Sequence, residues 1–363
     1  MSKVYFTNMR TTYSDNMLDK LKKLLLHSDF NTLDFKNKYV ALKIHFGEYG
    51  NLAFIKPNYV KVVADLIKEK GGFPFVTDCS TLYSGKRSDA ISHINVAELN
   101  GFNSTTTGCP IIIGDGLKGN DYKEIDVNLK HCSKVKIGAA LSEADIIISL
   151  NHFKGHEQAG FGGAFKNLGM GSGSKLGKLE MHSGSKPIIN KAKCIACGLC
   201  FDNCNQKAIN VEEKAVIDYN KCVGCGECIV VCPEKAISQK EIDQSKILNE
   251  KIVEYTYGLL KDKNHFHINF IMNVSPNCDC WSNNDLAIVP DIGIVASSDP
   301  VAIDMASIDL VNNADIIKGS ILDSIENKDY DKFKCIHGNV DWKSGLDYAQ
   351  ELDLGTKEYE LIV

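Results

Sequence analysis

The chain has 363 residues, of which 44% are hydrophobic and 24% are charged, and its formal net charge is −5. These values are typical of a globular protein with a large core and two or three domains. The small net charge excludes a protein built to wrap nucleic acid or to dock on an anionic membrane. The N-terminus has no basic segment followed by an apolar run, and no stretch reaches the length of a membrane span, so a cytoplasmic location is expected.

The N-terminal half alternates short apolar runs with longer amphipathic ones. Strands are expected in the first six residues and at 40–45, 73–78, 110–114 and 144–150. A helix is expected at 59–68, soon after Pro57. Runs rich in β-branched residues, separated by helices, are typical of a parallel sheet covered on both faces. We therefore predict an α/β body, in which ligands lie beyond the carboxyl ends of the strands.

The segment after the last of these strands is rich in glycine, with eight glycines between positions 155 and 177. Such a segment lets backbone amides approach a ligand closely, although it matches neither the P-loop nor the dinucleotide fingerprint. Its candidates for holding a cofactor are Gly160, Gly162 and Gly163. Its candidates for chemistry are His152, Lys154, His156, Lys166 and, shortly after them, His182, with His45 at the end of an earlier strand. The alternative is a solvated, flexible loop.

Eight of the fourteen cysteines lie in two similar runs. Residues 193–209 read KCIACGLCFDNCNQKAI and residues 221–237 read KCVGCGECIVVCPEKAI, with nine identities in seventeen positions. Each run has the Cys-x2-Cys-x2-Cys-x3-Cys spacing of bacterial ferredoxins, in which the fourth cysteine of a run ligates the cluster of the other run. The repeat predicts two [4Fe–4S] clusters in a module at 187–240; a zinc site is the alternative.

The ligands of each cluster follow from this exchange of the fourth cysteine between the two runs. The first cluster takes Cys194, Cys197, Cys200 and Cys232, and the second takes Cys222, Cys225, Cys228 and Cys204. Small residues between the cysteines let backbone amides approach the sulfurs, and these hydrogen bonds help to set the reduction potential. The second run ends in Cys-Pro as the pattern expects, whereas the first ends in Cys204-Asn205. Asparagine tolerates the turn geometry, so the ligand set stays complete.

The C-terminal part returns to the α/β pattern. A helix is expected at 242–260, strands at 266–272 and 293–297, and a further helix after Asp299-Pro300. We therefore divide the chain into a first body part at 1–186, the module at 187–240 and a second body part at 241–363, and leave open whether the body forms one lobe or two. Cys278 and Cys280 follow a predicted strand and converge if the chain turns there. They are candidates for a metal site, a redox relay or a nucleophile; two buried thiols without function are the alternative.

Several segments resemble the family called domain of unknown function 362, in the subgroup with an embedded ferredoxin module. They are LKIHFGE at 42–48, NHFKGH at 151–156, GGAFKNLGMG at 162–171, NCDC at 277–280, PDIGI at 290–294 and SDPVAID at 298–304. The resemblance covers nearly the whole chain and implies no settled reaction.

A shorter resemblance is to the nickel-pincer lactate racemases. The segment from His156 to Lys166, HEQAGFGGAFK, and the later His182-Ser-Gly are similar to the racemase segment in which the lysine anchors the cofactor, the second histidine ligates nickel and the first moves a proton or hydride. The resemblance implies that His156, Lys166 and His182 form a site on a related scaffold. The racemase arginine motif is not evident and the cysteine module has no racemase counterpart, so a nickel pincer is not expected.

The preferred hypothesis is a redox enzyme that passes electrons from the two clusters to a site in the body. A cytosolic protein would donate or accept the electrons, Lys154 and Lys166 would hold a small anionic substrate, and His156 would move protons. An additional metal or redox site would use His182, Cys278, Cys280, His152 or His45, and an organic cofactor such as a flavin stays open. Because exposed clusters are oxygen-sensitive, an anaerobic setting is expected. The alternatives are an electron carrier without its own substrate, and a racemase-like isomerase or lyase with structural or sensory clusters.

Overall fold

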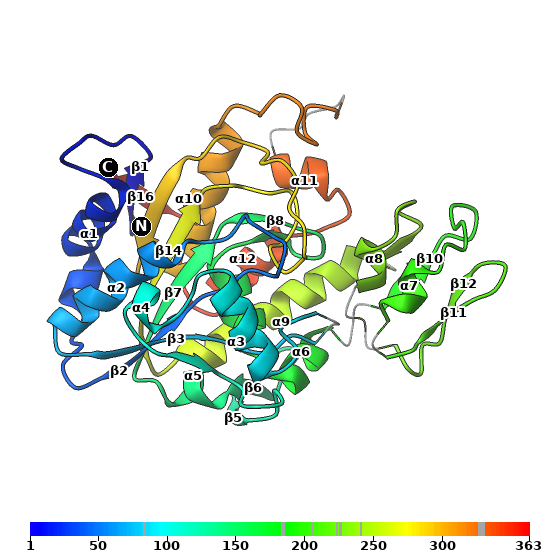
Figure 1. The fold of residues 1–363 in the computed structure, drawn as a ribbon, viewed down its shortest axis with the longest axis horizontal. Coiled ribbons are helices and arrows are strands. Elements are labelled where there is room, and N and C mark those ends of the chain that lie inside the picture. The colour runs from blue at the N-terminus through cyan, green and yellow to red at the C-terminus, as the bar shows by residue number, and fades with distance from the viewer. Residues whose placement is uncertain are drawn as a thin grey trace.

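The computed structural model describes residues 1–82, 85–182, 186–204, 206–222, 224, 227–239, 242–325 and 331–363. Its centre is an eight-stranded sheet with the strand order β16-β1-β15-β14-β7-β2-β3-β4 (Figure 1). The strands are β1 (Ser2–Asn8), β2 (Tyr39–Lys43), β3 (Phe73–Asp78), β4 (Ile111–Ile113), β7 (Ile146–His152), β14 (Asn264–Ile271), β15 (Gly293–Ser297) and β16 (Tyr359–Ile362).

The sheet is mostly parallel. Only β15 runs antiparallel to its two neighbours, β1 and β14, while every other adjacent pair is parallel. The predicted α/β fold with a parallel sheet is thereby confirmed. Strands β14 and β15, which follow the cysteine repeat in the sequence, lie between β1 and β7, which precede it. Both flanks of the repeat therefore build a single sheet.

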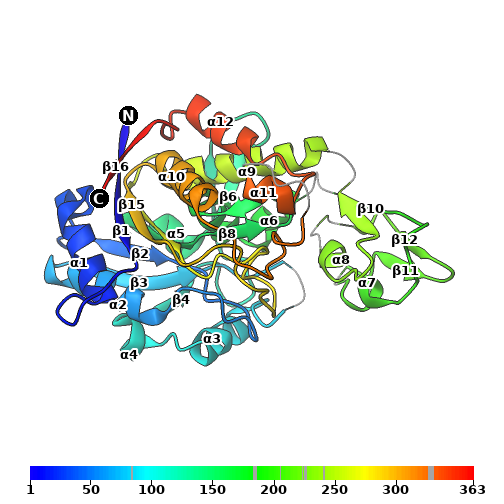
Figure 2. The same cartoon turned by 90° about the horizontal axis from the view of Figure 1, so that it is seen from above.

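Helices cover both faces of this sheet (Figure 2). Alternate residues of a strand point to opposite faces, and the core divides accordingly: Ala41 and Ile147 pack in one buried cluster, and Leu42 and Ile148 pack in the other. One face carries α1 (Met17–His27), α2 (Pro57–Glu69), α3 (Ala90–Leu99) and α4 (Ser104–Thr107). The other carries α6 (Lys175–His182), α9 (Ile242–Leu260), α10 (Pro300–Asn313), α11 (Lys332–Ile336) and α12 (Lys343–Glu351).

Local sequence signals explain where several helices begin. Asp299 caps α10 by accepting hydrogen bonds from the amides of Val301 and Ala302, and Pro300 occupies the first helical position, where its missing N–H costs nothing. Asn16 forms a capping box with Asp19 at the start of α1. Within the described residues, no helix is both long enough and apolar enough to cross a bilayer.

Shorter elements complete the body. They are the 3₁₀-helix Asp29–Thr32, the hairpin of β5 (Tyr122–Asp126) and β6 (Lys134–Gly138), helix α5 (Ala139–Glu143), the hairpin of β8 (Lys154–His156) and β9 (Gly160–Gly162), and a π-helical turn, Lys166–Met170. The glycine-rich segment thus forms the second hairpin and the π-helical turn. Most of its residues between 152 and 174 are buried, which contradicts the alternative of a solvated loop.

The cysteine repeat forms a small lobe set to one side of the body (Figures 1 and 2). It contains β10 (Pro187–Ile189), α7 (Leu199–Asp202), β11 (Ile209–Val211), β12 (Ala215–Ile217), α8 (Glu227–Val230) and β13 (Ile237–Gln239). Strand β10 pairs with β13, so the two ends of the lobe lie side by side, and β11 pairs with β12. The lobe has a buried cluster of its own, built from cysteine, alanine and isoleucine side chains.

Candidate functional site

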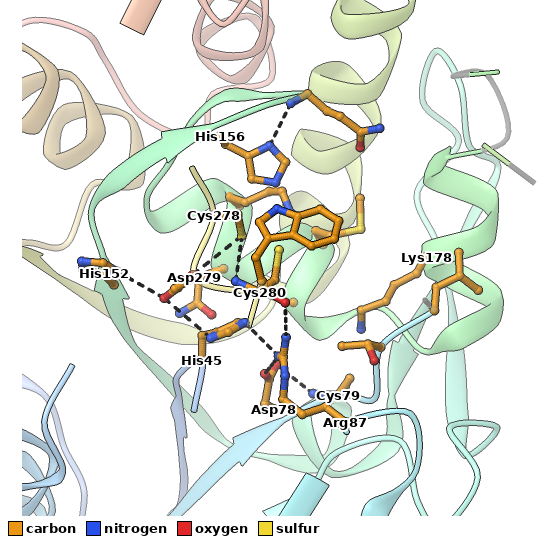
Figure 3. Close-up of a pocket in the computed structure, with 18 of the residues that line it drawn as sticks. His45, Asp78, Cys79, Arg87, His152, His156, Lys178, Cys278, Asp279 and Cys280 are labelled. Carbon is orange, nitrogen blue, oxygen red and sulfur yellow. Dashed lines mark hydrogen bonds and ion pairs between the residues drawn. The ribbon is translucent and has the colours of Figure 1, made fainter. Parts of the chain in front are cut away.

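A cavity opens beyond the carboxyl ends of β2, β3 and β7, where a parallel sheet gathers its ligand-binding side chains (Figure 3). It encloses about 1010 Å³, part of which is open to solvent. Its charged, polar and sulfur-containing lining includes Lys43, His45, Asp78, Cys79, Thr81, Arg87, His152, Lys154, His156, Glu157, Gln158, Lys166, Asn167, Lys178, His182, Cys278, Asp279 and Cys280. All eight side chains that the sequence singled out in the body, apart from the glycines, therefore meet at one cavity.

Asp279 is the central anion of the cavity. Its carboxylate lies 2.8 Å from Lys154 Nζ, 3.2 Å from His152 Nδ1 and 3.6 Å from His45 Nδ1. Burial by itself would raise the pKa of Asp279, but these neighbours hold it well below its usual value. Burial likewise disfavours the Lys154 ammonium, yet the Asp279 carboxylate raises the pKa of Lys154 above its usual value. Lys154 and Asp279 thus form a buried ion pair.

His45 connects this ion pair to a second charged network. Its Nε2 lies 2.8 Å from the Arg87 guanidinium, which only donates, and burial, opposed by the charge of Asp279 and aided by that of Arg87, holds the pKa of His45 well below its usual value. The ring is therefore neutral, and its Nδ1, which faces Asp279, lies 2.9 Å from the Gly47 amide that donates to it. Arg87 also binds Glu48 at 3.0 Å.

Lys43 and Asp78 form the corresponding pair at the ends of β2 and β3. Lys43 Nζ lies 2.9 Å from the Asp78 carboxylate and donates to Asn167 Oδ1 at 2.6 Å. The Lys43 side chain is fully buried, and burial is the largest cause that lowers its pKa. The pair thereby ties the sheet edge to the π-helical turn that carries Lys166.

His156 is held in one tautomer by the β8–β9 hairpin. Its Nδ1 accepts hydrogen bonds from the amides of Gln158 and Ala159, each at 3.1 Å, so the proton of the neutral ring lies on Nε2. Burial and the charges of Lys166 and Lys154 hold the pKa of His156 well below its usual value. At neutral pH the ring therefore offers a hydrogen-bond donor.

Two lysines of the lining have no carboxylate partner among the described residues. Lys166 makes neither a hydrogen bond nor an ion pair through its ammonium within that set, and Lys178 donates to the Gly173 carbonyl. His182 lies near both, and burial followed by these two charges lowers its pKa to about 3. The buried Nδ1 of His182 and Nε2 of Gln158 lack hydrogen-bond partners in the described part of the chain. This side of the cavity is therefore cationic and has unused polar atoms.

The three glycines singled out as cofactor-binding residues lie behind the described cavity wall. Gly162 lies beneath the Lys154 side chain, where a Cβ atom would approach its Cε to 3.1 Å. A Cβ atom at Gly160 would meet Trp342, and one at Gly163 would meet the buried Asp304 carboxylate at 2.3 Å. Because these three glycines have no side chain, the hairpin can pack closely against its neighbours.

The small lobe contains two further cavities of about 350 Å³ each. Cys194, Cys197, Cys200 and Cys232 line the first. Cys204, Cys222 and Cys228 line the second, and Cys225 lies outside the described residues. The cavities divide the seven described cysteines in the same way as the predicted quartets.

The residues around these two cavities have the chemistry that iron–sulfur clusters require. Thiolates are the usual ligands, and backbone amides approach the sulfurs: the Ala208 amide donates to Cys204 Sγ and the Ala236 amide to Cys232 Sγ, each at 3.3 Å. In the described part of the chain, no three His, Cys, Asp or Glu side chains converge so that they could hold a single metal ion. The described cysteines of each quartet instead line a cavity, and His182, Cys278 and Cys280 do not form an ion site within the described residues.

The lobe contributes to the wall of the body cavity. Ile229, on α8 beside Cys228, lines that cavity together with the body residues. The neighbouring Glu227 is buried, and burial followed by the nearby Glu48 raises its pKa to about 7. Glu48 in turn binds Arg87. A cysteine-bearing helix of the lobe and the charged network of the body are thus in close proximity.

Sequence reasoning missed several charged residues of the cavity. They are Lys43, Asp78, Arg87, Glu157 and Lys178. Lys43 and Asp78 end two predicted strands, so the rule that ligands lie beyond strand ends was a usable signal for both. For Arg87 the sequence offers no such signal, because it reaches the cavity from the loop before α3.

Several solved structures match this chain, among them two distant ones that cover most of it. The lactate racemase apoprotein from Thermoanaerobacterium thermosaccharolyticum is 11% identical with a TM-score of 0.39, covering 84% of this chain and 57% of that protein. A protein from Thermotoga maritima is 13% identical with a TM-score of 0.35, covering 76% of this chain and 54% of that protein. The chain thus spans little more than half the length of either protein. No curated protein matches it. The family model described as domain of unknown function (DUF362) matches residues 40–309, well over half of the chain, and the protein belongs to this family.

Proposed function

We propose that this protein is an iron–sulfur redox enzyme that acts on a small anionic substrate in the body cavity. The observation that carries the proposal is the position of α8: the helix that bears Cys228 also supplies Ile229 to the cavity wall. When bound, two [4Fe–4S] clusters would supply one-electron transfer. Cys194, Cys197, Cys200 and Cys232 would hold one cluster, and Cys204, Cys222, Cys225 and Cys228 the other.

The charges of the cavity support an anionic substrate. Lys43, Lys154 and Arg87 each have a carboxylate partner, whereas Lys166 and Lys178 have none among the described residues. An anion would therefore bind between these two lysines. Charge-assisted hydrogen bonds of this kind are about twice as strong as neutral ones.

The histidines would orient that anion. His156 Nε2–H would donate to it, because Nδ1 is already occupied by two backbone amides. We therefore narrow the predicted proton-moving role of His156 to that of a hydrogen-bond donor, which positions the substrate. His182, whose Nδ1 is buried without a described partner, is the side chain placed to form a further hydrogen bond with the substrate. A cavity with such groups favours an enzyme over a carrier without its own substrate.

The cluster proposal is tested by chemical analysis of anaerobically purified protein. We expect about eight iron atoms and about eight acid-labile sulfides per chain, with broad visible absorption that bleaches on addition of dithionite. Zinc in place of iron, or iron without labile sulfide, would contradict the proposal.

The anion site is tested with Lys166→Met and inorganic phosphate as the probe. We expect the substitution to weaken phosphate binding by about tenfold or more in calorimetric titration, since a hydrogen bond to a charged group contributes about 1.5 to 3 kcal/mol. Iron content should stay unchanged. Lys118→Met, which removes an exposed lysine far from the lining, is the matched control. Equal affinity in both variants would place the anion elsewhere.

A further inference from the structure

The loop that carries Cys278 and Cys280 brings both sulfurs to the cavity. Successive side chains of an extended strand point to opposite sides, but those of Cys278, Asp279 and Cys280 all line the same cavity (Figure 3). Cys278 is 5% exposed and Cys280 is partly exposed. The chain turn between them therefore defines a two-sulfur site within reach of a bound molecule.

Backbone contacts hold this turn in place. The Cys280 amide donates to Cys278 Sγ at 3.4 Å, and the Gly155 amide donates to the Ser275 carbonyl at 2.9 Å. Gly155 lies directly against the loop, since a Cβ atom there would come within 2.0 Å of the Pro276 carbonyl oxygen.

Glu157 fixes the other side of the turn. Its carboxylate accepts hydrogen bonds from the Cys278 amide at 3.2 Å and from the Trp281 indole at 2.8 Å. These contacts reach the loop from the β8–β9 hairpin, so the sulfur pair is clamped between separate parts of the body.

The two thiols have different chemical character. Burial disfavours the Cys278 thiolate, but the hydrogen bond from the Cys280 thiol and the charge of Lys154 lower the pKa of Cys278 below its usual value. The same hydrogen bond, together with burial, raises the pKa of Cys280 well above its usual value. An attacking thiolate next to a protonated partner is the arrangement that thiol–disulfide exchange requires.

We infer that Cys278 and Cys280 form a dithiol–disulfide couple whose oxidant is a small anionic disulfide bound beside Lys166 and Lys178. The Cys278 thiolate attacks one sulfur of the bound disulfide, breaking its S–S bond and forming a mixed disulfide, and the released thiolate takes up a proton. Cys280 then loses its proton and attacks Cys278 Sγ, forming the Cys278–Cys280 bond and releasing the second thiol. In total the dithiol loses two electrons and two protons, and the bound disulfide gains them.

Return of the pair to the dithiol consumes two electrons and two protons, and this half of the inference rests on the proposed function. Two one-electron centres match the two electrons that the disulfide needs. The charge of the cavity selects the oxidant, because Lys166 and Lys178 favour a disulfide that carries carboxylates.

Oxidised glutathione, a small disulfide with carboxylates, serves as the probe on anaerobically purified, iron-loaded protein. The tryptic peptide 264–318 contains Cys278 and Cys280 and no other cysteine, and the peptide 88–118 contains Cys109 alone. After oxidation and alkylation, we expect peptide 264–318 to lose both alkylatable thiols and to weigh two hydrogen atoms less, while Cys109 stays alkylated. Two alkylated thiols, or a glutathione on each cysteine, would overturn the inference.

The variants Cys280→Ser and Cys278→Ser test the order of attack. Cys280→Ser should retain glutathione at Cys278, since the resolving thiol is missing, and Cys278→Ser should react far more slowly. Equal rates of adduct formation in the two variants would overturn the assigned roles. Iron content reports whether each variant keeps its fold.

A second measurement separates this inference from the proposed function. Oxidised protein is treated with reduced methyl viologen, a one-electron donor, and the thiols of peptide 264–318 are counted again. We expect both thiols to return in the wild-type protein and not in the double variant C228A and C232A, which removes a ligand from each quartet. A disulfide that forms but does not return in the iron-loaded wild type would contradict the electron link while leaving the couple in place.

Discussion

Substitution of Cys232 by alanine is expected to remove about half of the iron and sulfide, leaving about four of each per chain. Cys232 lies in the second run of the repeat, but it lines the cavity of Cys194, Cys197 and Cys200, which belong to the first run. Its loss should therefore affect the cluster of the first run. Iron and labile sulfide are measured on anaerobically purified protein, and Cys109→Ala, a buried cysteine outside the lobe, is the control.

Double substitutions make the crosswise assignment decisive. The pair C200A and C232A removes two ligands of one quartet, so the loss should be no greater than in C232A alone. The pair C228A and C232A removes a ligand from each quartet, so nearly all of the iron should be lost. If instead the first pair lost nearly all of the iron and the second pair lost only half, each run would hold its own cluster.

Removal of the Asp279 carboxylate in D279A is expected to lower the free energy of unfolding by about 3 to 5 kcal/mol, as is typical when one partner of a buried ion pair is deleted. The Lys154 ammonium is almost completely buried and would lose its counter-ion, which lies 2.8 Å away. His152 Nδ1 would lose its partner as well. Chemical denaturation under anaerobic, reducing conditions measures the change.

The control for this prediction is E98A, which removes an exposed carboxylate from helix α3. Surface substitutions of this kind usually change stability by no more than about 0.5 kcal/mol. In D279N the shape of the side chain is kept while its charge is lost, so most of the destabilisation should persist if the charge of Lys154 is its cause. Equal stability of D279A and E98A would show that the buried pair contributes little.

Most strands and several helices could be predicted from the sequence, because the patterns that indicate them lie in neighbouring residues. The strand β3 (Phe73–Asp78) and the helix α9 (Ile242–Leu260) have the predicted bounds, and α10 begins at Pro300 as its capping pattern predicts. Strand β16 was not predicted. Its four residues form a strand because they pair in parallel with β1, more than 350 positions away in the sequence. No local pattern encodes that pairing.

The cavity was predictable only in part. His156, Lys166 and His182 lie in one unusual segment, and the sequence placed them together correctly at the ends of the strands. The network around Asp279 was not predictable, because His45 and Asp279 are separated by 234 positions, and only the parallel order of β2, β7 and β14 brings them together.

By itself, the sequence determined the α/β class and the two cysteine runs, since hydrophobic periodicity and ligand spacing are properties of neighbouring residues. The tertiary structure alone decided that both flanks of the repeat share one sheet, that Lys154 is neutralised by Asp279 while Lys166 is not, and that α8 lines the cavity. These features depend on which side chains, distant from one another in the sequence, become buried together. Burial and the neighbouring charges then determine which of these side chains are ionised.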